Sequence, residues 1–336
     1  MRRSWIDALV HWGTGRRVPW WALVAGFWAF EVLALSAVHW WDGSLEVGHP
    51  FSRTVDMSYG IAGVVVYGML SRTAAASFDT FRPALEIPDD EAARWRHRLT
   101  TMTPWTAVAV AVIGPIMAVA ALLADPTTVD LATTSVAATI LGVAFHWVIN
   151  FTVALLVLPH LASQLALITR LHGWVVHIDV FHPQPAHAFS RVTARGGSAI
   201  LLVLAYMMLT NPAGFTNPVW LWTSAAGIVL AVVAFLLPLR GMHRRLQDEK
   251  RQLLDRSAGR LRAASADLHR AVDAAGYAPV AELRGVLQAL DEDRTRIKTA
   301  STWPWETATA RGFATTLLLP IGIWLVTGVL GKSLGL

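Results

Sequence analysis

The sequence predicts an all-α fold of the integral membrane class. We expect a polytopic protein of about seven transmembrane helices, with a cytoplasmic antiparallel helical hairpin before the last span. The chain of 336 residues is 54% hydrophobic and only 15% charged, whereas soluble domains contain about 25% charged residues. Its apolar residues are gathered into runs close to the length of about 20 residues that crosses a bilayer. Its basic residues fall in every second connecting segment, which is the pattern of a membrane protein whose cytoplasmic loops carry an excess of lysine and arginine.

Seven apolar segments form the predicted spans. We place them at about 19–39, 55–71, 104–124, 135–158, 197–211, 218–239 and 313–331. The second contains MSYGIAGVVVYGMLS, which is short for a full crossing and includes three glycines. The fifth is also short, and the turn NPAGFTNP joins it to the sixth, so these two helices are expected to be antiparallel neighbours. Residues 1–239 thus form the predicted transmembrane bundle.

The distribution of lysine and arginine predicts the orientation of the chain. Every second segment outside the predicted spans is rich in lysine and arginine: the N-terminal segment and segments 72–103, 159–196 and 240–312. Of the 28 basic residues, only Arg53 and Lys332 lie in the other segments. Basic loops resist translocation and stay in the cytoplasm. We therefore expect a multi-pass protein of the plasma (inner) membrane, with the N-terminus cytoplasmic and the C-terminus outside.

Residues 240–300 differ from the spans because they carry many charges and no long apolar run. Apolar and small residues recur there at three- and four-residue spacing in two stretches, which predicts two helices. These residues are Leu254, Ala258, Leu261, Ala264, Leu268 and Val272 in the first stretch, and Leu283, Val286, Leu287 and Leu290 in the second. The predicted hairpin is either a solvated helix pair held by its own seam, or a coiled-coil-like element for oligomerisation or partner docking.

The remaining segment, 301–336, contains a WPW tract and the last transmembrane helix. Trp303 and Trp305 flank Pro304 in this tract. Tryptophan is enriched where a membrane protein meets the headgroups. We therefore expect both side chains to act as anchors at the cytoplasmic interface.

Few ionisable or amide side chains lie within the predicted spans, and three of them are candidate pathway residues. Glu31 is near the middle of the first span, and His146 and Asn150 are one helical turn apart in the fourth. A carboxyl group in hydrocarbon must be protonated, paired or hydrated, so an intramembrane glutamate is a functional candidate. A pair between Glu31 and His146 would satisfy both groups, and such a pair could also serve only as an interhelical hydrogen bond.

A histidine-rich stretch, LHGWVVHIDVFHPQPAHAF, offers candidate metal ligands. It contains His172, His177, Asp179, His182 and His187. Imidazole and carboxylate groups bind divalent transition metals. The spacing of five residues between histidines does not place them on one helix face, so the alternative is four histidines with no common partner.

The sequence disfavours most other chemistries. Cysteine is absent, which excludes disulfides and cysteine metal sites. The Gly-x-Ser-x-Gly, HExxH, P-loop and GxGxxG motifs are also absent. No cofactor is expected beyond that transition metal, and an enzyme is disfavoured. Nucleic acid is not an expected partner, because the cations are spread over short loops rather than gathered in a basic domain.

Two functional hypotheses remain. The first is a channel or transporter-like protein for an ion or small solute, forming a homo-oligomer in the lipid bilayer, with the three intramembrane polar residues in its pathway. The alternative is a non-catalytic scaffold or signalling subunit that docks a cytoplasmic partner through residues 240–300.

The orientation can be tested with fusions to a reporter that is active only outside the cytoplasm. We expect activity for a fusion after residue 336 and none for a fusion in the loop 72–103, because the charge distribution places these points on opposite sides. A C-terminal reporter that is active only in the cytoplasm would contradict the predicted topology.

Overall fold

The computed structural model is helical throughout the part of the chain that it describes. The described residues are 4–8, 20–44, 59–124, 133–175, 179–181, 183–210, 218–274 and 277–334. Seven helices within them are long and apolar enough to cross a membrane, and each overlaps one predicted span. This confirms the all-α class and supports a multi-pass membrane protein.

The described residues form the following helices, in chain order. Those of the first half are α2 (Trp20–Asp42), α4 (Tyr59–Phe81), α5 (Asp89–Thr100), α6 (Pro104–Ala124), α7 (Val136–Gly142), the π-helix η3 (Val143–Val148), α8 (Ile149–Leu155) and α9 (Val157–Gly173). Those of the second half are α10 (Gln184–His187), α11 (Ser190–Thr210), α12 (Pro218–Leu236), the 3-10 turn η5 (Leu237–Leu239), α13 (Arg240–Asp273), α14 (Tyr277–Thr299) and α15 (Thr307–Leu334).

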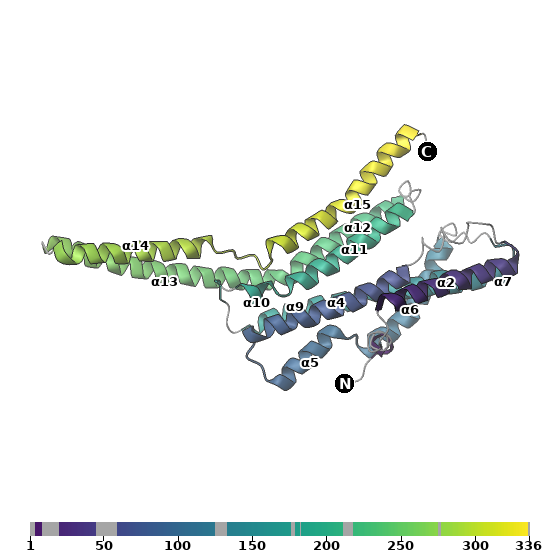
Figure 1. The fold of residues 1–336 in the computed structure, drawn as a ribbon, viewed down its shortest axis with the longest axis horizontal. Helices are drawn as coiled ribbons and strands as arrows, with labels where there is room; N and C mark the ends of the chain where they lie inside the picture. The colour runs from purple at the N-terminus through teal and green to yellow at the C-terminus, as the bar shows by residue number, and fades with distance from the viewer. Residues whose placement is uncertain are drawn as a thin grey trace.

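The helices form two packed groups. Helices α11, α12 and α15 lie together, and α4 packs with α2, α8 and α9 (Figure 1). Helix α4 also contacts α11, which joins the groups. Large apolar side chains on the outer faces are exposed, among them Trp105 at 82% and Leu33 at 68%, as expected where lipid replaces water.

Three helices continue well beyond the predicted span ends. Helix α4 runs to Phe81 rather than to residue 71, α9 runs to Gly173, and α11 starts at Ser190. The hydropathy signal ends where the bilayer would end, but apolar residues at helical spacing continue. Ala74, Phe78 and Phe81 lie on one side of α4 and are almost fully buried, so packing rather than hydropathy extends the helix.

These extensions build the largest apolar core in the described part of the chain. It joins the end of α4, the end of α9, the start of α11, the start of α13 and helix α5. The buried side chains include Phe81, Leu99, Leu171, Phe189 and Met242. Trp95 of α5 also belongs to this core, with an edge-to-face contact to Trp174.

Segments that the charge alternation places on the same side of the spans contact one another in the structure. Trp5 near the N-terminus donates to the carbonyl of Ala107 at the start of α6, at 3.3 Å. At the opposite ends of the helices, Asp42 at the end of α2 accepts from the backbone N–H of Ser135, just before α7, at 2.8 Å. The large core likewise joins three pieces predicted to share one side. Which side faces the cytoplasm stays a prediction.

Helices α13 and α14 lie side by side and extend away from the other helices as a long pair (Figure 1). The chain remains helical from α12 through η5 into α13, and α13 alone is about 50 Å long at 1.5 Å per residue. Ser257 and Ala264, seven residues apart, are its buried small residues beyond the base. Val272 and Val286 are exposed at 48% and 45%.

Glycine permits the closest helix contact in the first group. A Cβ atom on Gly63 of α4 would lie 2.9 Å from Cα of Ala154 and 3.0 Å from the carbonyl oxygen of Val153, both backbone atoms of α8. Real Cβ atoms do not approach so closely, so a larger residue would force the two helices apart.

We predict that Gly63→Ala lowers the thermal midpoint of unfolding in detergent by several degrees, corresponding to overpacking of about 1–3 kcal/mol. Gly26→Ala is the matched control, because a Cβ there meets nothing within 4 Å, and alanine favours a helix over glycine. Equal midpoints for the two variants would show that α4 and α8 do not pack this closely.

Candidate functional site

The intramembrane glutamate is hydrogen-bonded across two helices. The side-chain amide of Asn150 in α8 donates to Oε1 of Glu31 in α2, at 2.7 Å. The backbone N–H of Gly60 in α4 donates to Oδ1 of the same asparagine, at 2.9 Å. Glu31 is 9% exposed and Asn150 is 2% exposed. Asn150 therefore links three helices and holds the carboxyl group within the bundle.

The glycine at position 60 is needed for this contact. A Cβ atom there would lie 2.5 Å from Oδ1 of Asn150. Any other residue would displace the amide that binds Glu31. The local structure of α4 thus sets the position of the asparagine.

An apolar cluster packs nearby. Leu35 of α2, Ala118 of α6 and Trp147 of η3 are buried together, and Nε1 of Trp147 donates to the carbonyl of Ala118 at 2.8 Å. Such surroundings strengthen a hydrogen bond, and they make an unpaired polar group costly.

The helix segment before Asn150 is a π-helix, at Val143–Val148. Single turns of π-helix insert an extra residue and occur often at functional sites. This segment contains His146, whose side chain lies outside the described residues. The Glu31–His146 pair that the sequence suggests stays a prediction. The described hydrogen bond of Glu31 is to Asn150, the third candidate of the same set.

Three of the five candidate metal ligands, His172, Asp179 and His187, lie among the residues that the structure describes. No group of three or more potential ligands occurs there, while His177 and His182 lie outside the described residues. His172 is 1% exposed, packs edge-to-face against Phe81 and Phe189, and contacts the carbonyl of Pro238 through Nδ1 at 3.0 Å. These contacts give His172 a packing role. Asp179 accepts a bond from the N–H of Phe181 in its own loop.

The two tryptophans of the WPW tract are part of a series of stacked rings. His243 stacks on Trp303 with centroids 4.1 Å apart, and Trp303 stacks on Trp305 at 4.5 Å. The series continues through Phe235, which stacks on Phe313 at 4.4 Å. It fastens the start of α13 to the start of α15. The role of Trp303 and Trp305 as anchors at the membrane interface stays a prediction. Trp303 is 49% exposed.

A second buried polar cluster is not evident in the sequence. The hydroxyl of Tyr67 donates to Oδ1 of Asp7 at 2.6 Å, and its ring packs on His160, with centroids 4.1 Å apart. Nε2 of His160 lies 3.0 Å from both Ser71 and Gln164. The position of His160 near a span end suggests contact with water, but it is 1% exposed. The cluster holds the N-terminal segment against α4 and α9.

No protein-family model matches the chain, and the comparisons with curated proteins and with solved structures find no match. The functional argument therefore rests on the geometry of the site.

Proposed function

We propose that the protein is a channel or transporter-like membrane protein for an ion or small solute, with Glu31 as the group that binds the permeant species or a coupled proton. The observation that carries the proposal is the Glu31–Asn150 bond in the middle of the predicted spans, next to a π-helical segment. Ionisable residues at this depth are costly and are typical of ion and substrate pathways.

The geometry supports a specific division of roles. Gly60 fixes the carbonyl end of the Asn150 amide, so its nitrogen points at the carboxyl group. A cation or proton that binds at Oε1 must replace or share the bond from Asn150. Breaking that bond removes the described side-chain hydrogen bond between α2 and α8, so occupancy of Glu31 and the contact between these helices are linked.

An oligomer would complete this pathway. Phe30 and Leu33 flank Glu31 in sequence and are 57% and 68% exposed, a surface that lipid or a second copy covers. Closed symmetry would repeat Glu31 around one axis, and rings of a single acidic residue select cations in channels. We propose such a homo-oligomer.

Ion flux into liposomes that contain the purified protein tests the proposal. We expect Glu31→Gln to reduce proton or cation flux about tenfold or more, the effect of losing roughly 1.4 kcal/mol of charge interaction. Glutamine still accepts the bond from Asn150, so the melting temperature stays unchanged. His146→Ala tests the second pathway candidate in the same assay.

The matched control is Glu282→Gln, which makes the same chemical change at an exposed position on α14. We expect it to conduct as the wild type does. Wild-type flux by Glu31→Gln, with intact folding, would leave the Glu31–Asn150 bond as helix-to-helix packing only.

The hairpin favours a second candidate function, a scaffold or signalling subunit. The pair α13–α14 extends away from the spans, on the end of a helix that is continuous with α12 (Figure 1). Val272 and Val286 leave apolar surface exposed on the two arms. A cytoplasmic protein that packs on this surface is the proposed partner.

A shortened variant tests this second function. Nζ of Lys250 donates to the carbonyls of Lys298 and Ala300 at 2.6 and 2.8 Å, so a short Gly/Ser linker can replace residues 251–297. The measurement is chemical crosslinking of the protein to its partner. We expect the shortened variant, and the double variant Val272→Asp with Val286→Asp, to lose the crosslinked partner. The wild type and Glu282→Gln should retain it. Retention by the shortened variant would place the partner elsewhere.

A further inference from the structure

A cavity of about 780 Å³ lies between α4 and the α10–α11 segment, away from Glu31. Its lining includes three basic residues, Arg72, Arg191 and Arg195, and one acidic residue, Glu306. Three cations against one anion leave an excess of positive charge. A cavity of this volume accommodates a small organic molecule.

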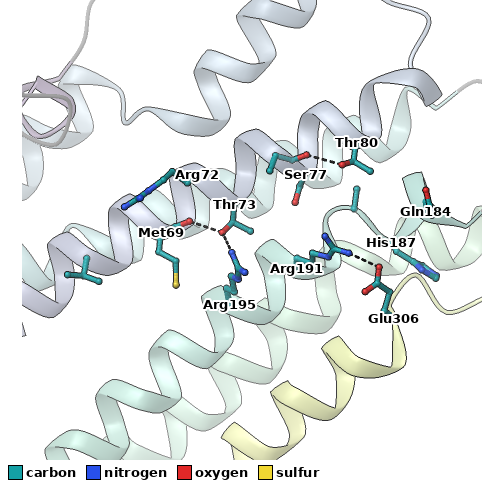
Figure 2. Close-up of a pocket in the computed structure, with 13 residues that line it drawn as sticks. Met69, Arg72, Thr73, Ser77, Thr80, Gln184, His187, Arg191, Arg195 and Glu306 are labelled. Carbon is teal, nitrogen blue, oxygen red and sulfur yellow. Dashed lines mark hydrogen bonds and ion pairs between the residues drawn. The ribbon is translucent and has the colours of Figure 1, made fainter. Parts of the chain in front are cut away.

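The arginines are held in place by the protein around them. Nη1 of Arg195 donates to the hydroxyl of Thr73 on α4, at 2.5 Å, and that hydroxyl donates to the carbonyl of Met69 at 2.7 Å. Arg191 pairs with Glu306 at 2.8 Å. Figure 2 shows Arg195 extending from α11 toward Thr73, and Arg191 extending toward Glu306. Each guanidinium carries five N–H donors, so most donors remain for a ligand.

Arg72 adds a third cation from the other wall. Its Nε donates to the carbonyl of Gly68 in its own helix, at 3.3 Å, which leaves its two Nη groups uncommitted by that bond. Ser77, 4% exposed, adds a hydroxyl further along α4. Several arginine forks with hydroxyl groups form the donor set that recognises phosphate oxygens.

The two ends of the cavity differ in polarity. Val65 and Met69 line it toward the apolar part of α4, whereas Thr80 and Gln184 line the opposite end. Arg72 directly follows the predicted second span, and Arg195 lies two residues before the fifth. In the predicted topology the arginines therefore stand at the level of the inner-leaflet headgroups, where basic pockets between helices bind anionic lipids.

We propose that this cavity binds a phosphate-bearing anion, with Arg72 and Arg195 as its principal ligands. The phosphate comes either from an anionic phospholipid, whose acyl chain would follow the apolar end, or from a soluble phosphate compound. The site shares no residue with the pathway proposed for Glu31.

The test is a titration of the purified full-length protein in detergent, followed by thermal unfolding. The probes are dihexanoyl-phosphatidylglycerol, dihexanoyl-phosphatidylcholine and inorganic phosphate. We expect a saturable rise in melting temperature with phosphatidylglycerol, and an apparent affinity about tenfold weaker for Arg72→Gln. Arg72→Gln should fold, because the described bond of Arg72 lies within its own helix. Arg195→Gln is the second variant. Arg260→Gln, at an exposed position on α13, is the matched control and should bind as the wild type does.

The outcomes separate the two sources. Saturable stabilisation by phosphatidylglycerol alone assigns the site to a lipid, and equal stabilisation by inorganic phosphate assigns it to a soluble compound. Equal stabilisation by phosphatidylcholine and phosphatidylglycerol would indicate acyl-chain binding and overturn the proposal. So would unchanged affinity in Arg72→Gln, or no stabilisation of the wild type by any probe.

Discussion

The close packing of α4 on α8 is the constraint on which the rest of the structure depends. Gly60 and Gly63 bring the backbone of α4 directly against α8, and the N–H of Gly60 then reaches Asn150. Asn150 in turn reaches Glu31 on α2. Small residues at helix interfaces serve this purpose in membranes, where no hydrophobic force drives helices together and van der Waals contact must do so.

Because α4 is long, the same helix positions two different sites. Its first turn carries Gly60, at the Glu31 site, and Thr73 lies 13 residues further on, about 20 Å along the axis. Beyond that point Phe78 and Phe81 anchor the large core. A displacement of α4 relative to α8 would therefore change the Glu31 contact and the arginine cavity together.

The sequence was sufficient for the class and for the approximate position of every span, because membrane length and hydropathy are local properties. It was insufficient for the ends of α4, α9 and α11, which depend on side chains that meet only in the folded chain. Glu31 and Asn150 were recognisable as intramembrane polar residues, but their pairing was not. The prediction that His146 and Asn150 share a face assumes a regular helix, and the π-helix at Val143–Val148 changes that register. The cluster around Asp7 and Tyr67 is not predictable from the sequence, because the N-terminal segment carries only a charge signal.

The base of the hairpin packs against the elements that form the arginine cavity. Met242 and Leu246 of α13 belong to the same core as Phe81 and Phe189, and the stacked rings from His243 to Phe313 tie α13 to α15. Glu306, which follows those tryptophans, pairs with Arg191 in the wall of the cavity. A partner that moves the hairpin must therefore strain either this core or this stack, and each of them borders the cavity between α4 and α11. Docking at the hairpin and ligand binding at the arginines consequently act on the same packed elements.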